Sequence, residues 1–507
     1  MLAIVKSTAL HGLDGQVVQV EVDVSNGLPC FDLVGLPDPA VREARDRVRA
    51  ALKNSGFEYP LGRITVNLAP ADIRKEGPLY DLPIAAGILA ATGQLDADVL
   101  GRYVFIGELS LNGALRRVTG VLPNVLAARE QGCREVIVPL ENAREAALVQ
   151  GMKIYPVGSL EQLNNFLRGT EEIAPYWADP GDLLAASGQG GEEPDLADVK
   201  GHAAAKRALE VAAAGGHNVL MIGSPGSGKT MLARRLPGIL PDLAFEEALE
   251  VTKIHSLAGM LTPEQPLVTR RPFRAPHHTA SAVSLVGGGR YPRPGEISLA
   301  HRGVLFLDEL PEYPRDVLES LRQPLEDRVV TISRVNAAVT YPASIVLIAA
   351  MNPCPCGYHG DSAQNCTCTP YQVQRYLNRI SGPLLDRIDL HLEVPRLDYR
   401  ELNDSARGET SAAVKKRVNQ AWAIQQERFG SAAWNAQMTP AQVRKYCSLT
   451  KEAKMLLQTA FRQLNLSNRA HDRILMTART IADLDGGGVI SAAHLAEAIQ
   501  YRSVRIK

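Results

Sequence analysis

The stretch "GSPGSGKT", residues 223–230, decides the fold of the largest part of the chain. It follows an apolar run, "NVLMIG", and precedes "MLARRL", so it stands between a predicted strand and a predicted helix. This is the setting of a P-loop, whose glycines let backbone N–H groups converge on phosphates at the start of a helix. The residues predicted to bind a nucleotide are Gly223, Ser224, Pro225, Gly226, Ser227, Gly228, Lys229 and Thr230.

Four residues have predicted roles in phosphate chemistry. In a P-loop, Lys229 reaches the β- and γ-phosphates and Thr230 holds Mg²⁺. Downstream, the buried strand predicted from "GVLFLDEL" ends in Asp308 and Glu309. We expect Asp308 to bind Mg²⁺ through water, and Glu309 to polarise the water that attacks the nucleotide. The predicted cofactors are therefore ATP and Mg²⁺.

Two further polar residues lie near the ends of predicted strands. The run "SIVLIAAMN" ends in Asn352, which is the candidate for contact with the γ-phosphate. The stretch "GPLLDRIDLHLEVP" places Arg387 near a surface turn. An arginine there can enter the site of a neighbouring subunit as an arginine finger. A plain salt bridge to Asp386 or Asp389 explains Arg387 equally well.

The composition restricts the class of protein. A chain of 507 residues has room for about three domains. Lysine plus arginine equals aspartate plus glutamate, 55 against 55, so net charge does not indicate nucleic-acid binding and any basic surface is local. Lys6 interrupts the first apolar run, and no stretch approaches the length of a membrane span. We expect a cytoplasmic protein without membrane contact.

The chain divides by composition into four segments. Residues 1–170 contain predicted strands, among them "QVVQVEVDVS", "YVFIGELSL" and "REVIVP", mixed with helices. Residues 171–198 are rich in Gly, Pro and acid and predict a linker. Residues 199–398 alternate continuous apolar strands with helices, which predicts a parallel sheet covered on both faces. Residues 399–507 predict a small helical domain.

Together the P-loop, "LFLDEL", the strand that ends in Asn352 and "LLDRID" resemble the AAA+ ATPases. The long gap from Thr230 to Asp308 resembles the branch of magnesium chelatase subunits and MCM helicases, which has a helix insert and a β-hairpin before the sensor strand. "FDLVGLPD" near the start and "LSNRAHDRILMTARTIADL" near the end extend the resemblance over essentially the whole chain. The family that it resembles is the ComM/YifB family of magnesium-chelatase-like bacterial proteins.

This resemblance implies a role for each motif. Asp308 and Glu309 are the Walker B pair, Asn352 is sensor 1, Arg387 is the finger that acts on a neighbouring subunit, and Arg469 in "SNR" is the sensor 2 arginine. The resemblance also implies a homo-hexameric ring with sites between subunits. Family members are associated with natural transformation and act as helicases that migrate DNA branches. Single-stranded and branched DNA, and recombination proteins, are the implied partners.

The N-terminal segment resembles the Lon proteolytic domain. "KEGPLYDLPIAAGILAATG" and "GELSLNGALRRVTGVLPNVLAAREQGCREVIVP" stand where Lon-like proteases carry their catalytic serine and lysine, but these positions are Leu79 and Leu122. A serine–lysine dyad needs a hydroxyl and an amine, so we expect no peptidase activity. The same segment contains a basic helix, which is either a DNA contact or a solvated face. Its residues are Arg42, Arg45, Arg47, Arg49 and Lys53.

Two stretches suit DNA contact independently of the family. "VGGGRYPRPGE", residues 286–296, combines arginines with a tyrosine in a Gly/Pro-rich loop, which suits phosphate contact and base stacking. "VVTISRVNAAVTYP", residues 329–342, predicts two short strands around a tip. In related rings both elements line the pore; the alternative is that both are solvated loops. The candidate DNA contacts are Arg290, Tyr291, Arg293, Arg334 and Asn336.

Four of the seven cysteines follow the sensor strand in "AAMNPCPCGYHGDSAQNCTC", residues 349–368. The spacing differs from the commoner CxxC pairs of zinc ribbons, but four thiolates within so short a stretch can close a tetrahedral site. A structural Zn²⁺ site is one interpretation, and free thiols or a redox switch are the others. The candidate ligands are Cys354, Cys356, Cys366 and Cys368.

The sequence thus predicts an α/β protein: a Lon-protease-like N-terminal domain, an AAA+ parallel sheet with a P-loop, and a C-terminal α-helical lid. The predicted function is an ATP-dependent hexameric DNA helicase or translocase, with a role in branch migration during natural transformation or homologous recombination. The alternative is a magnesium-chelatase-like ATPase motor that remodels a partner protein. A third possibility is a regulatory ATPase that binds without moving its partner.

Overall fold

The chain folds as two units that do not follow the order of the sequence. The first unit consists of Met1–Gln189 and Ala244–Thr269, and the second of Gly190–Leu243 and Arg270–Lys507. A segment that directly follows the P-loop region along the chain therefore folds with the N-terminal unit. The structure, a computed structural model, describes residues 1–179, 181, 194–289, 292–334, 337–361, 363–398, 408–464 and 466–503.

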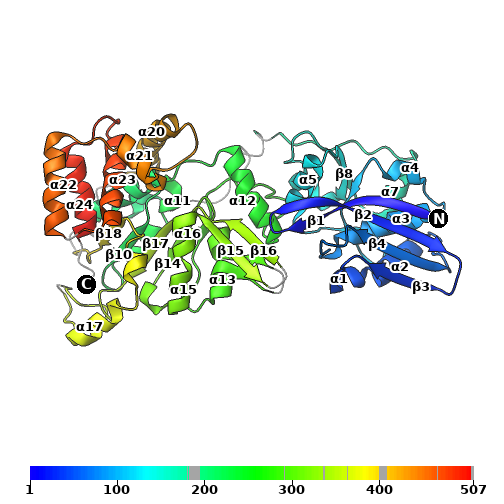
Figure 1. Ribbon diagram of the computed structural model, residues 1–507, viewed down its shortest axis with the longest axis horizontal. Helices are drawn as coiled ribbons and strands as arrows, with labels where there is room; N and C mark the ends of the chain where they lie inside the picture. Colours follow the sequence, from blue (N-terminus) through cyan, green and yellow to red (C-terminus); the bar gives the residue numbers. More distant parts are fainter. Residues whose placement is uncertain are drawn as a thin grey trace. The chain divides into compact units, whose positions relative to one another are not determined.

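A mixed sheet forms the centre of the first unit (Figure 1). Its long strands β1 and β2 pair antiparallel, and in β2 every second side chain from Val18 to Val22 is buried, the period of two that its sequence predicts. Strands β5, β8 and β9 continue the sheet in parallel. In sheet order the strands are β3 (Cys30–Val34), β4 (Arg63–Ala69), β2 (Asp14–Ser25), β1 (Leu2–His11), β5 (Val104–Phe105), β8 (Glu135–Pro139) and β9 (Lys153–Val157).

One predicted strand of this unit is wrong. "YVFIGELSL" is not continuous, because β5 ends at Phe105 and β6 (Glu108–Leu109) belongs to a separate hairpin with β7 (Leu115–Arg116). Between them, the N–H of Gly107 donates to the carbonyl of Leu79 instead of continuing the ladder. An apolar run alone therefore overestimated the length of the strand.

Buried helices cover the sheet of the first unit. Helices α3 (Asp81–Ala91) and α5 (Val121–Glu130) both contact β1 and β2, and every residue of α3 is buried. Helix α2 (Ala44–Asn54) packs on α3. The returning segment contributes α12 (Phe245–Leu257), which packs on α5.

Five parallel strands form the sheet of the second unit. The apolar runs that the sequence assigned to strands occupy four of the five positions, with β10 between β17 and β18. This confirms the predicted parallel α/β sheet. In order the strands are β11 (Phe273–Arg274), β14 (Val304–Leu307), β17 (Val346–Met351), β10 (Val219–Ile222) and β18 (Leu390–Glu393).

The predicted C-terminal helices are present and belong to the second unit, in orange and red in Figure 1. Their buried side chains join those of the sheet and of α9 (Ala203–Gly215) in one hydrophobic core. Threonine and serine side chains cap several of them, as at Thr410 and Ser467. The helices are α20 (Ser411–Phe429), α21 (Pro440–Tyr446), α22 (Lys451–Gln463), α23 (Asn468–Leu484) and α24 (Ala492–Ser503).

Two hairpins in the second unit occupy the stretches predicted to meet DNA. Strands β15 (Val329–Arg334) and β16 (Ala337–Pro342) pair antiparallel, as the sequence predicts. Strands β12 (Gly287–Gly288) and β13 (Arg293–Pro294) form a second, shorter pair. Across the part of the chain that the structure describes, no helix combines the length and apolar character needed to cross a lipid bilayer.

Candidate nucleotide-binding site

The residues predicted to act on the phosphates follow three neighbouring strands, at one edge of the parallel sheet. The P-loop follows β10, Asn352 follows β17, and Asp308 and Glu309 follow β14. Because β17 lies between β10 and β14, Asn352 stands between the P-loop and the acidic pair. The carboxyl ends of parallel strands are the usual place for ligands in such sheets.

Lys229 is the best-connected residue of the P-loop. Its Nζ donates to the carbonyls of Gly223 at 2.7 Å and Ser224 at 2.9 Å, and to Oδ1 of Asn352 at 3.3 Å. Burial lowers the pKa of Lys229 from its ordinary value, although Asp308 and Glu309 act in the opposite direction. A partly desolvated ammonium group favours a nearby phosphate more strongly than an ammonium group in water does.

Thr230 and Asp308 lie side by side. The Thr230 hydroxyl donates to Oδ2 of Asp308 at 2.8 Å, and the backbone N–H of Glu309 donates to Oδ1 at 2.9 Å. A hydroxyl oxygen beside a carboxylate is the type of donor set that Mg²⁺ prefers. These residues therefore fit the cation that the P-loop motif implies.

Glu309 has a partner that sequence reasoning missed. Its Oε2 lies 3.2 Å from Nδ1 of His278, and its backbone is in the left-handed region at φ 51°. His278 comes from the stretch after β11, which the Tyr313 hydroxyl fixes by donating to the carbonyl of Pro276 at 2.6 Å. The only signal in the sequence was the pair His277–His278, which shows nothing of its distance from Glu309.

The two predicted arginines lie together, at a different edge of the sheet. Arg387 precedes β18 and binds the carboxylate of Glu326, and Arg469 at the start of α23 binds the other oxygen of that carboxylate at 3.1 Å. The hydrogen bond from Arg387 lowers the pKa of Glu326 despite partial burial. Arg387 is 5% exposed, whereas the Arg469 side chain is 58% exposed.

The sequence alternative for Arg387, a salt bridge to Asp386 or Asp389, differs from the observed pairing with Glu326. Asp389 is instead buried, where it accepts from the backbone N–H of Asn218 at 3.0 Å and pairs with Arg473 at 3.0 Å. Four arginines line a pocket of about 350 Å³ at this edge, together with the acidic Glu326, Asp386 and Asp472. Its arginines are Arg328, Arg387, Arg469 and Arg473.

The four clustered cysteines converge. Their sulfur atoms all lie within 4.8 Å of one another, and three pairs are 3.3 to 3.7 Å apart. Backbone N–H groups of Tyr358 and Thr367 lower the pKa of the Cys356 thiol to about 5. The arrangement fits a tetrahedral thiolate site for Zn²⁺.

The predicted DNA contacts are only partly described. Arg290, Tyr291 and Asn336 lie outside the described residues. Arg334 is the last residue of β15, and Arg293 is exposed on β13.

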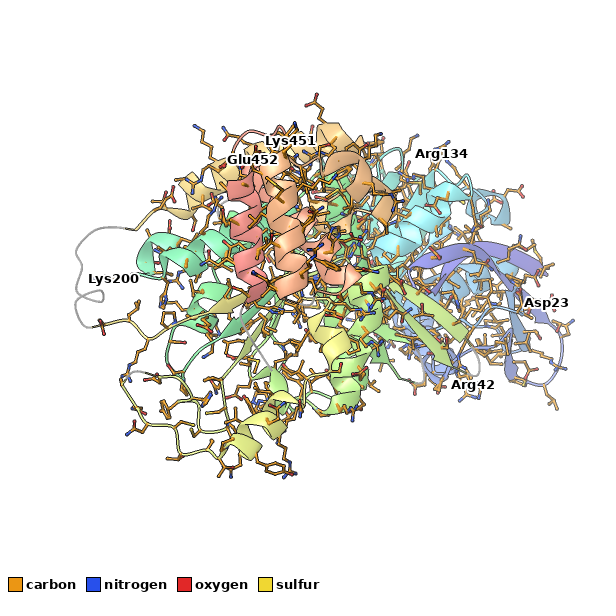
Figure 2. The ribbon with its side chains drawn as sticks, turned by 60° about the vertical axis from the view of Figure 1, so that its left-hand side comes forward. Asp23, Arg42, Arg134, Lys200, Lys451 and Glu452 are labelled. Carbon is orange, nitrogen blue, oxygen red and sulfur yellow. The ribbon has the colours of Figure 1, made fainter. Side chains whose placement is uncertain are left out.

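The predicted basic helix is two helices, α1 (Pro39–Arg42) and α2, and several of its arginines have internal partners. Arg47 binds the buried carboxylate of Asp81 at 2.7 Å, and Arg49 lies over the ring of Tyr59. Arg42, Arg45 and Lys53 are exposed, and Arg42 is visible at the edge of the first unit (Figure 2).

The positions that a Lon-type dyad would occupy are buried leucines. Leu79 lies in a short 3-10 helix and Leu122 in α5, with 8% and 0% of their surfaces exposed. Neither side chain supplies a nucleophile or a base.

Comparison with known proteins gives the chain its family. "Competence protein ComM" of Haemophilus influenzae is 50% identical over 504 residues, which cover 99% of this chain and 98% of that protein. The chain belongs to the ComM/YifB family. YifB of Escherichia coli is 47% identical over 504 residues, 99% of this chain and 97% of that protein. "Lon protease 2" of Bacillus subtilis is 27% identical over 181 residues, 32% of each chain.

Family models place magnesium-chelatase-like sequence in both units of this ComM/YifB protein. "Magnesium chelatase, subunit ChlI" matches residues 195–402, "Subunit ChlI of Mg-chelatase" matches residues 20–142, and "Magnesium chelatase, subunit ChlI C-terminal" matches residues 408–502. Together with the parallel sheet and the C-terminal helices, these matches confirm the predicted fold class: a Lon-protease-like N-terminal part, an AAA+ sheet and a helical C-terminal part.

Proposed function

We propose that the protein is an ATP-driven, hexameric ring motor that moves on DNA. In this proposal it acts in the cytoplasm as a helicase that migrates DNA branches during natural transformation or homologous recombination. The name of its relative, "Competence protein ComM", supports a role in DNA uptake. Branched and single-stranded DNA are the proposed substrates, and recombination proteins are the proposed partners.

The proposal of a ring rests on one observation, the separation between the two groups of residues. Lys229 and Asp308 lie at the carboxyl edge of the parallel sheet, whereas Arg387 precedes β18 at the amino edge and is joined there by Arg469. A four-residue strand separates the two edges by about 13 Å. The arginines therefore suit the nucleotide of a second copy better than their own. A head-to-tail contact of this kind, repeated with a closing rotation, makes a ring.

The chain's own groups divide the work of hydrolysis. Lys229 binds the terminal phosphates, and Asn352 fixes the position of the Lys229 ammonium. Thr230 and Asp308 would hold Mg²⁺, which would supply positive charge to the phosphate oxygens. Glu309 orients and polarises the attacking water once its carboxylate is released from His278. Arg387 and Arg469 offset the charge that develops on the neighbour's phosphates.

The DNA part of the proposal rests on the two hairpins of the second unit. The pair β15–β16 and the pair β12–β13 carry the arginine-containing stretches, and Arg293 is exposed. Arginine side chains on hairpins suit a backbone-tracking contact with DNA, whose affinity falls with salt.

The cysteine cluster is proposed as a structural Zn²⁺ site. Zn²⁺ with four thiolates is a closed, tetrahedral site without an open position for substrate. Its proposed ligands are Cys354, Cys356, Cys366 and Cys368, whose sulfur atoms lie within 4.8 Å of one another.

A second candidate function is a chelatase-like motor that remodels a partner protein. The match of residues 195–402 to "Magnesium chelatase, subunit ChlI" favours it, because that name belongs to a metal-chelatase subunit. The two candidates share the nucleotide site and differ in the partner that ATP hydrolysis moves.

Strand displacement on a forked DNA substrate tests the proposal. Wild type should hydrolyse ATP faster with DNA and unwind the fork, whereas Glu309→Gln should bind nucleotide and DNA without unwinding. Lys229→Ala, which removes the phosphate contact, should bind nucleotide weakly. If no DNA stimulates the ATPase of the wild type, the chelatase-like motor is the better explanation.

A further inference from the structure

The loop that contains the cysteine cluster lies directly against the P-loop. Gly357 has φ +89°, and a Cβ placed on it would come within 2.6 Å of Cδ of Pro225. The backbone of the loop therefore packs on the ring of a proline that belongs to the nucleotide site. Only glycine permits both this backbone conformation and this approach.

A polar contact lies beside this apolar one. Oδ1 of Asp361 accepts from the backbone N–H groups of Ala363 at 2.8 Å and Gln364 at 3.1 Å, which fixes the local turn. The Ser224 side chain lowers the pKa of the same carboxylate, so the two groups face each other. Ser224 also accepts the hydrogen bond from Lys229 through its carbonyl, so Asp361 lies beside a residue that contacts Lys229.

The two ends of the loop are tied to the same site. It begins at Asn352, whose side chain contacts Lys229. It ends at α17 (Pro370–Leu377), where the backbone of Asn352 opposes the rise that burial causes in the pKa of Tyr376. The start, the middle and the end of the loop thus each lie close to the P-loop or to Asn352.

Within its described residues, 353–361 and 363–369, the loop has neither a helix nor a strand. Two hydrogen bonds within the loop close short turns. The N–H of Gly357 donates to the carbonyl of Cys354, and the N–H of Asp361 donates to the carbonyl of Tyr358. Closing such a loop costs conformational entropy that these turns offset only in part. The sulfur atoms of Cys354, Cys356 and Cys366 are 3.3 to 3.7 Å apart, close to the spacing of about 3.8 Å that four Zn–S bonds of 2.3 Å impose.

We propose that Zn²⁺ bound by the four thiolates holds this loop as one wall of the nucleotide site, so that occupancy of the metal site sets the affinity for ATP. The inference rests on the nucleotide and zinc sites proposed above and does not depend on DNA as the partner. The metal acts by positioning: it touches neither nucleotide nor water, and its effect reaches the phosphates through Gly357, Asp361 and Asn352.

The test uses the purified full chain. Zinc is counted by elemental analysis, and affinity is measured by titration with a fluorescent ATP analogue. Wild type should contain one zinc per chain. The double variant Cys366→Ser, Cys368→Ser should lose zinc and bind the analogue about tenfold more weakly, the loss expected from about one hydrogen bond and its packing. Cys133→Ser, a cysteine outside the cluster, should match wild type.

The variant Asp361→Ala tests the contact between the loop and the P-loop without removing a metal ligand. It keeps all four cysteines, so it should retain zinc and still bind the analogue several-fold more weakly. It also keeps the proposal testable if the double variant does not fold. Removal of zinc from wild type with a chelator should weaken binding, and zinc, but not Mg²⁺ or Ca²⁺, should restore it.

Two results would overturn the inference. If the wild-type chain neither contains nor takes up zinc, both this inference and the zinc site proposed above are wrong. If a chain loses zinc while its affinity for the analogue stays constant, the zinc site stands but does not set the affinity for ATP. Neither result bears on unwinding, so failure of this inference and failure of the DNA motor are distinguishable.

Discussion

Nδ1 of His278 lies 3.2 Å from a carboxylate oxygen of Glu309, the residue that is expected to polarise the attacking water. The contact joins the stretch after β11 to the end of β14, two neighbouring strands. A carboxylate that is engaged with an imidazole is a weaker partner for water. We therefore expect the pair to restrain hydrolysis until it separates.

We expect His278→Ala to raise ATP hydrolysis in the absence of DNA. Both side chains are partly exposed, so the contact is worth about 0.5–1 kcal/mol, or a two- to fivefold rate increase. A steady-state ATPase assay with and without DNA measures it. His277→Ala serves as the control because His277 bonds to Thr279 instead of Glu309. Equal or lower basal activity of His278→Ala would show that His278 supports Glu309 rather than restraining it.

Arg469→Ala should lower turnover without lowering stability. The side chain is 58% exposed and shares Glu326 with Arg387, so its loss leaves the fold intact. If it acts on a neighbour's phosphates, kcat should fall by about 10² or more while the affinity for ATP changes little. Arg462→Ala, an exposed arginine on α22, is the matched control. An effect on the melting temperature in place of kcat would contradict this role.

His391 predicts a pH dependence of stability. Burial on β18 lowers its pKa to about 4, below the ordinary value of 6.5, so the folded chain holds the neutral imidazole. The unfolded chain then binds more protons between these values. The contribution of neutral His391 to the free energy of unfolding, up to about 3 kcal/mol, is fully present above pH 6.5 and is lost as the pH falls toward 4.

Urea unfolding at pH 7 and pH 4.5 measures this contribution. His391→Gln keeps a hydrogen-bonding side chain but takes no proton, so its stability should fall less on acidification than that of wild type. His11→Gln, at the exposed end of β1, should behave as wild type does. Parallel pH curves for all three chains would exclude a role for His391.

Removal of the N-terminal part should make the remaining chain aggregate. Helix α12 buries Ala248, Val251 and Ile254 within the first unit, and the carbonyl of Ser256 accepts from the N–H of Gly120. A fragment of residues 190–507 leaves this apolar face uncovered. Replacing residues 244–269 of that fragment by a short Gly/Ser linker should restore solubility. Sedimentation of the two fragments compares them.

The local motifs predicted much of the fold and of the nucleotide edge. Strand–loop patterns predict Lys229, Asp308 and Asn352 as site residues, and the structure brings them to one edge because parallel strands end there together. The parallel sheet followed in the same way from its apolar runs. Each of these inferences depends on residues that are close in the sequence.

Contacts between distant residues could not be predicted in this way. The pairing of Arg387 with Glu326 joins two segments whose spacing carries no signal, and the same holds for His278 and Glu309. The apolar face of α12 has the same pattern whichever unit covers it, so its place in the first unit was not visible. Gly107 broke a predicted strand through a hydrogen bond to a residue far along the chain.

The membership of residues 244–269 in the first unit also sets the order of events during synthesis. The ribosome releases the N-terminal residues first, yet their fold is incomplete until the segment beyond the P-loop has emerged. At bacterial rates this delay is about ten seconds. During that interval α12 has not yet packed on α5. We therefore expect chaperones that bind exposed apolar surface to bind the nascent N-terminal part.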